Sequence, residues 1–147
     1  FYFTHNYLYL YLTITTPGLF SLKDLFDLSL ELDVHTLIKT TFAFDSSIMM
    51  CPQVLPRELY NECIDDVLNY VKPKIAKTPK YSYWITCLED LKNRQTFEEK
   101  YPDWQEGLKA GKERLQKVDK WRKNEGIIEK IYSENPKVLK WWKKKAI

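Results

Sequence analysis

The sequence predicts an α+β fold: an antiparallel β-sheet of three or four strands in residues 1–50, followed by four or five α-helices in residues 51–147 that pack on it. Two observations carry this prediction. Apolar and polar side chains alternate through most of the first third, as in a strand with one buried face, whereas after Pro52 apolar residues recur every three or four positions. A chain of 147 residues is the usual size of one domain, so we expect residues 1–147 to form a single domain.

The clearest strand signal is "YLYLYLTIT", residues 7–15. The even positions hold leucine and isoleucine, while the odd positions hold Tyr7, Tyr9 and Tyr11, so the two sets face opposite sides of a strand. If the even positions face the core, the tyrosines form an exposed aromatic strip suited to a protein partner. The alternative is that both faces are buried within the chain.

Turn and strand signals continue as far as Cys51. Pro17-Gly18 has turn chemistry and predicts a hairpin. Even-numbered apolar residues then recur from Phe26 to Phe44, which predicts further antiparallel strands with a bend near His35-Thr36.

Proline and capping residues delimit the predicted helices. One helix runs from Pro56 to Pro73, and Ser82 can cap the next. Thr96 and Glu99 have the spacing of a capping box, and Asn135-Pro136 opens the last helix. Between them, a stripe at three- and four-residue spacing predicts a long helix; its members are Trp104, Leu108, Gly111, Leu115, Val118 and Trp121.

Charge and cysteine content limit the compartments and partners that suit this chain. Residues 1–50 carry two lysines against five acids, a net charge of −3, and residues 51–147 carry 21 basic against 15 acidic residues, a net charge of +6. The three cysteines form no C-x-x-C motif, which favours an intracellular, reducing compartment. Import into an organelle stays open because Phe1 does not look like a native start. The first 22 residues lack charged side chains, but their tyrosines and Pro17-Gly18 argue against a transmembrane span.

The residues that carry chemistry are few. Two histidines and three scattered cysteines do not make a zinc site, and four glycines are too sparse for a phosphate-binding loop, so we expect no metal and no cofactor. Cys63 and Cys87 fall on apolar helix faces, where a cysteine is usually a small buried hydrophobe. The chain is therefore expected to have no enzymatic activity, with a Cys or His site as the alternative.

The tail "NPKVLKWWKKKAI", residues 135–147, is cationic and aromatic. In a helix its apolar residues share one face, and three uses fit that arrangement: packing of the indoles against protein, attachment to an anionic membrane surface, and binding of nucleic acid. Packing is favoured because the helix is short and arginine is scarce. The candidate partner-binding residues in the tail are Lys140, Trp141, Trp142, Lys143, Lys144 and Lys145.

These features favour a subunit of a larger complex that interacts with protein through the aromatic strand face and the tail helix. A nucleic-acid-binding module that uses the basic, aromatic tail is the alternative. No small-molecule substrate is inferred.

Overall fold

The computed structural model describes residues 9–40, 48–123 and 126–145, and it corrects the predicted fold class. Helices, 3-10 helices included, make up 71% of the described residues, which form seven α-helices and a single two-stranded parallel sheet. The prediction of an antiparallel sheet with three or four strands is therefore wrong. The predicted strands that would involve residues 1–8 and 41–47 lie outside the described residues.

The sheet pairs β1 (Tyr9–Ile14) with β2 (His35–Thr40), from Tyr9 opposite His35 to Ile14 opposite Thr40. The chain crosses between them through a short 3-10 helix, η1 (Pro17–Ser21), and α1 (Leu22–Glu31). The hairpin predicted at Pro17-Gly18 is thus wrong, because Pro17 begins a 3-10 helix. Strands that run in parallel need such a crossover connection.

The first part of the predicted strand run is a helix because its burial follows helical spacing. Leu22, Phe26 and Ser29 are buried in α1, four and three residues apart, whereas Leu28 and Leu32 are exposed. Asp33 follows α1 and has a left-handed backbone conformation, with a φ of 53°. Burial alternates after it: Val34 and Thr36 are buried, whereas His35 and Leu37 are exposed. Even-numbered leucines in α1 had imitated a strand pattern.

Helices α2 (Arg57–Ile75) and α3 (Tyr83–Lys92) supply much of the core, and a 3-10 helix, η4 (Pro79–Tyr81), joins them. α3 packs against α2 and β2, and α1 packs against α2. The helix predicted to stop at Pro73 continues to Ile75, which is buried. The side chains at the centre of the core include Phe26, Tyr60, Ile64, Val71, Trp84 and Leu88.

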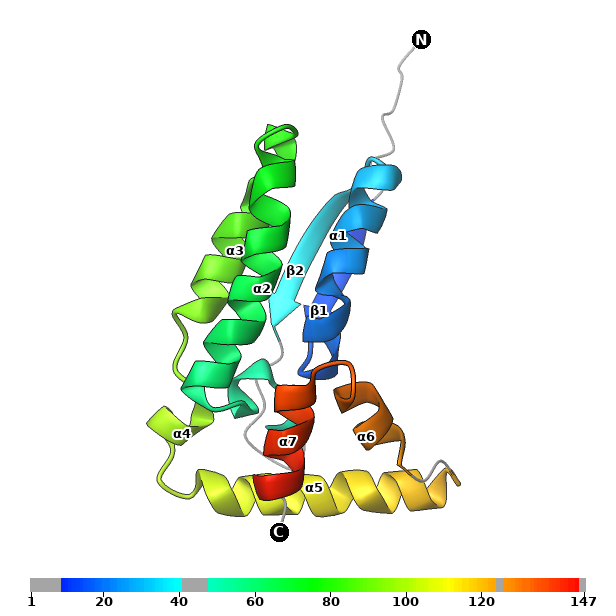
Figure 1. Ribbon diagram of the computed structural model, residues 1–147, viewed down its shortest axis with the longest axis vertical. Helices are drawn as coiled ribbons and strands as arrows, with labels where there is room; N and C mark the ends of the chain where they lie inside the picture. The colour runs from blue at the N-terminus through cyan, green and yellow to red at the C-terminus, as the bar shows by residue number, and fades with distance from the viewer. Residues whose placement is uncertain (1–8, 41–47, 124–125, 146–147) are drawn as a thin grey trace.

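The remaining helices form the base of the molecule, where α5 (Trp104–Trp121) runs across the ends of the other elements (Figure 1). Two 3-10 helices, η2 (Ile48–Met50) and η3 (Pro52–Val54), precede α2, and η2 packs on α5. The short α4 (Phe97–Lys100) carries the predicted capping box, in which the Glu99 carboxylate accepts from the Thr96 N–H at 2.9 Å. α6 (Ile127–Tyr132) and α7 (Pro136–Lys145) pack on each other, and in Figure 1 α6 lies above the C-terminal half of α5.

Candidate interaction surfaces

The outer face of the sheet is the first candidate surface. In β1 burial alternates as the sequence predicts, and Tyr9 and Tyr11 are 44% and 66% exposed. Leu37, directly opposite Tyr11 in the register, is 40% exposed, and the rings of Tyr9 and His35 lie 6.1 Å apart. Tyr7 belongs to the residues that the structure leaves undescribed. We call Tyr9, Tyr11, His35 and Leu37 the tyrosine face.

The two strands differ in how well their inward side chains are covered. Thr36 of β2 is fully buried, and β2 contacts α3. In β1, by contrast, only Ile14 of the inward residues is buried, whereas Leu10 and Leu12 remain half-buried. Within the described ranges no third strand pairs with β1, so among these residues its outer edge has no strand partner beside the exposed tyrosines.

The tail helix α7 is held by its own N-cap. The Asn135 side-chain oxygen accepts from the N–H groups of Lys137 at 3.1 Å and Val138 at 3.2 Å, as the Asn-Pro start predicts. The Asn135 amide nitrogen also lies 3.7 Å from the Cys63 sulfur of α2. These contacts fix the start of α7 against α2.

The two tail tryptophans lie inside the chain's own core. Trp141 and Trp142 are 8% and 2% exposed. The Trp142 ring stacks edge-on against Tyr132 at 5.3 Å, and its indole N–H donates to Glu129 at 3.3 Å. Val138 is also buried, so the apolar face of α7 is covered by this chain.

The opposite face of α7 is exposed and is therefore the face that a partner could contact. Pro136, Leu139, Lys140 and Lys143 line an open hollow of about 530 Å³ on that face. Lys140 and Lys143 are exposed, and the side chains of Lys144 and Lys145 lie outside the description. The structure therefore separates the predicted tail residues, with the tryptophans inward and two lysines outward.

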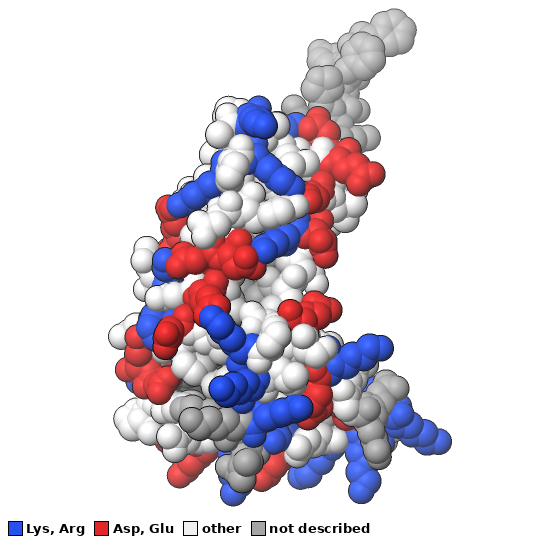
Figure 2. Space-filling model, in the orientation of Figure 1, with Lys and Arg blue, Asp and Glu red and all other residues white. Residues whose placement is uncertain are grey.

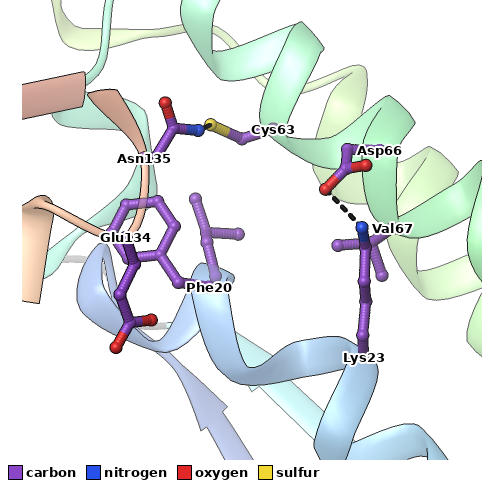
Figure 3. A pocket seen from close by; sticks show the side chains of 8 residues that line it. Phe20, Lys23, Cys63, Asp66, Val67, Glu134 and Asn135 are labelled. Carbon is purple, nitrogen blue, oxygen red and sulfur yellow. Dashed lines mark hydrogen bonds and ion pairs between the residues drawn. The ribbon is translucent and has the colours of Figure 1, made fainter. Parts of the chain in front are cut away.

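A small cavity of about 220 Å³ lies where α1, α2 and the start of α7 meet (Figure 3). In it the Lys23 ammonium points to the Asp66 carboxylate at 2.7 Å, and Asn135 points to Cys63. Burial, aided by Glu62 and Asp66, raises the pKa of Cys63 to about 12. The thiol is therefore protonated at neutral pH, which does not suit a nucleophile.

The other cysteines and the histidines add no catalytic group to this cavity. Burial raises the pKa of the Cys87 thiol as well, and Cys51 is fully buried. His35 is exposed on the tyrosine face, and His5 is not among the described residues. Over the described ranges, no three metal-ligating side chains gather at one point, and no helix is long and apolar enough to cross a bilayer.

Sequence reasoning missed which basic side chains form ion pairs and which do not. Among the described residues, most lysines and arginines before residue 104 form ion pairs, such as Lys74 with Asp27 at 2.5 Å and Lys92 with Asp65 at 2.6 Å. Later in the described chain, several cations take part in no ion pair; they are Lys109, Lys117, Lys120, Arg122, Lys123, Lys130, Lys140 and Lys143. Figure 2 shows blue side chains gathered around the C-terminal end of α5, at the lower right.

Trp121, at the end of α5, is 83% exposed, the highest value among the exposed large hydrophobic side chains of the described chain. The predicted stripe is buried at Trp104, Leu108 and Gly111, half-buried at Leu115 and Val118, and open at Trp121. Spacing alone could not reveal this, because it does not show where the body beneath the helix ends.

No family model, curated protein or solved structure matches this chain.

Proposed function

We propose that this chain is a protein-interaction subunit without enzymatic chemistry, and that it binds an extended segment of a partner protein along β1. The observation that supports this most directly is the tyrosine face beside an unpaired strand edge. A parallel sheet is normally covered on both faces, and two strands alone are marginal. A third strand supplied by a partner would extend the sheet and cover Leu10 and Leu12.

β1 is a better edge for such a partner than β2. The inward residues of β1 are half-buried and its tyrosines are exposed, whereas β2 already packs against α3. In strand addition, backbone hydrogen bonds supply affinity and alternate side chains supply specificity. Tyr9 and Tyr11 provide large contact areas at a low cost in conformational entropy.

Selection from a displayed library of random peptides tests this proposal without a known partner. Peptides that bind the chain should carry alternating apolar residues, and their amide NMR perturbations should map to Tyr9–Ile14. The double substitution Tyr9→Ser/Tyr11→Ser should weaken their binding about tenfold or more, since loss of one buried aromatic anchor alone costs ~2 kcal/mol. Trp121→Ala, which removes an exposed aromatic ring elsewhere, is the matched control and should leave binding unchanged.

The proposal fails if no peptide is selected, or if selected peptides bind the serine variant as well as the wild-type chain. Light scattering after size exclusion adds a second arm. A dimer that Tyr9→Ser/Tyr11→Ser dissociates would make a second copy of this chain, rather than a different protein, the occupant of the edge.

A further inference from the structure

The C-terminal half of α5, with the two residues that follow it, carries a concentrated positive charge. Residues 114–123 hold five basic residues and one acid, Asp119, a net charge of +4. Lys117, Lys120, Arg122 and Lys123 are exposed and form no ion pair within the described part of the chain. Because these ammonium and guanidinium groups are not neutralised internally, they attract an anionic ligand more strongly than paired ones would.

This positive charge is part of a larger charge asymmetry between the first 103 residues and the rest of the chain. Residues 1–103 contain 10 basic and 14 acidic residues, a net charge of −4, and residues 104–147 contain 13 basic and 6 acidic residues, a net charge of +7. An anion is therefore drawn toward the base of the molecule and repelled by the rest. The C-terminal half of α5 lies at that base (Figures 1 and 2).

Trp121 gives this surface a flat aromatic face among the cations. It follows Lys117 by four residues, so the two side chains are neighbours on the helix surface, and Lys120 and Arg122 flank it in sequence. An indole that is 83% exposed has both ring faces accessible to a planar group. Unpaired cations beside an accessible aromatic ring are the elements that bind single-stranded nucleic acid, because phosphates meet the cations and bases stack on the ring.

An anionic membrane fits this surface less well. A helix that lies in a membrane buries a whole apolar face, but the apolar face of α5 is used at Trp104, Leu108 and Gly111 to pack on the body. The apolar residues before Trp121 on its own side, Val118 and Leu115, are half-buried, which leaves Trp121 as the only exposed large apolar side chain of the described α5. Base stacking needs only one ring, whereas insertion into lipid needs several apolar side chains.

We propose that the C-terminal half of α5, through Trp121, Lys117 and Lys120, binds single-stranded nucleic acid. This site is separate from the tyrosine face, and it does not use Trp141 or Trp142. The proposed nucleic-acid site is thus α5 and not the tail, because the tail indoles are buried and Trp121 is the only exposed tryptophan among the described residues.

Fluorescence anisotropy with a labelled 12-residue oligothymidylate, measured on the full chain from 20 to 200 mM NaCl, tests the proposal. Trp121→Ala should weaken binding about fivefold or more, the equivalent of losing one stacked base. Lys117→Gln/Lys120→Gln should make the log–log salt dependence shallower by about 1.4, since each neutralised phosphate contributes roughly 0.7 on a single strand. Lys77→Gln/Lys100→Gln, an equal charge change at two exposed lysines elsewhere, and Tyr9→Ser/Tyr11→Ser should both leave affinity and slope nearly unchanged.

Several results would overturn the proposal. They are the absence of oligothymidylate binding at 20 mM NaCl, binding that Trp121→Ala leaves intact, and competition by polyglutamate as effective as that by unlabelled oligothymidylate. Cosedimentation with phosphatidylserine vesicles without binding to the oligonucleotide would identify a membrane surface instead. Circular dichroism of each variant confirms that the fold is retained, and loss of oligonucleotide binding with peptide binding intact separates this site from the tyrosine face.

Discussion

Glu99 shows how one side chain can join three segments. Its carboxylate caps α4 and pairs with Arg57 of α2, whose guanidinium also donates to the carbonyls of Lys92 at 3.0 Å and Arg94 at 2.7 Å. The Arg57 hydrogen bonds, with the Thr96 N–H, lower the pKa of Glu99 from 4.5 to about 2. The unfolded chain therefore binds a proton at Glu99 at higher pH than the folded chain does.

This shift predicts a stability contribution that depends on pH. Because the folded pKa is lowered, the contribution is present above pH 4.5 and is lost as the pH falls toward 2. Glu99→Gln should lower the urea midpoint at pH 6, and its deficit should shrink as the pH falls below 4. Glu98→Gln, which removes a charge from the same turn of helix, is the control; an equal deficit for both variants at pH 6 would contradict the assignment.

Gly111 is a second residue whose identity the packing dictates. A Cβ atom added there would lie 2.7 Å from Cγ of Met49 and 2.8 Å from Cγ2 of Ile48, both of which are buried. Gly111→Ala should therefore destabilise the chain by about 1–3 kcal/mol, although alanine gains about 1 kcal/mol in helix propensity. The cost in urea unfolding should be smaller in a Met49→Ala background, and an unchanged cost would show that contact with Met49 is not its cause.

At the scale of elements, the sequence predicted correctly those features that depend on a few neighbouring residues. The alternation in β1, the Thr96–Glu99 box and the Asn135 cap all appear as predicted. The error in residues 26–31 arose because leucines two residues apart fit a strand, while burial at Leu22, Phe26 and Ser29 fits a helix. Parallel pairing of β1 with β2 could not be predicted either, since alternation does not identify a partner strand.

The tail helix is an element whose attachment can be measured. Trp142→Ala removes a fully packed indole that contacts Tyr132 and Glu129, and should cost about 3–5 kcal/mol in the free energy of unfolding. Trp121→Ala is the same substitution at a ring that is 83% exposed, and should change it by less than about 0.5 kcal/mol. Equal effects of the two substitutions in urea denaturation would contradict the burial of Trp142.

At the scale of the whole molecule, the sequence revealed the sign of the charge asymmetry but not its geometry. Composition placed excess positive charge after residue 50, and the structure shows that many cations before residue 104 form ion pairs, whereas Lys117, Lys120, Arg122 and Lys123 near the end of α5 form none among the described residues. Ion pairs join residues far apart in the chain, such as Lys74 with Asp27, so only the folded arrangement reveals them. The candidate surface at Trp121 depends on that arrangement and was missed for the same reason.

The reactivity of the three cysteines can show whether the whole chain unfolds cooperatively. Cys51 and Cys63 are 0% and 6% exposed, whereas Cys87 is only half-buried. In native-state labelling with a thiol reagent, read by mass spectrometry, Cys87 should react first, and Cys51 and Cys63 should react only at the rate of global unfolding. Fast labelling of Cys63 without urea would contradict both its burial and its raised pKa.

The parallel register also sets the order in which the chain can fold. Tyr9 pairs with His35, 26 residues later, so β1 leaves the ribosome well before its partner strand exists. At about 5–20 residues per second this interval is roughly 1–5 seconds, during which "YLYLTI" is an unpaired segment of high β-propensity with no charge. Early formation of α1 shortens the loop to be closed and brings β2 beside β1. Nascent chains in which β1 has left the ribosome and β2 has not should therefore be the ones that depend most on chaperones.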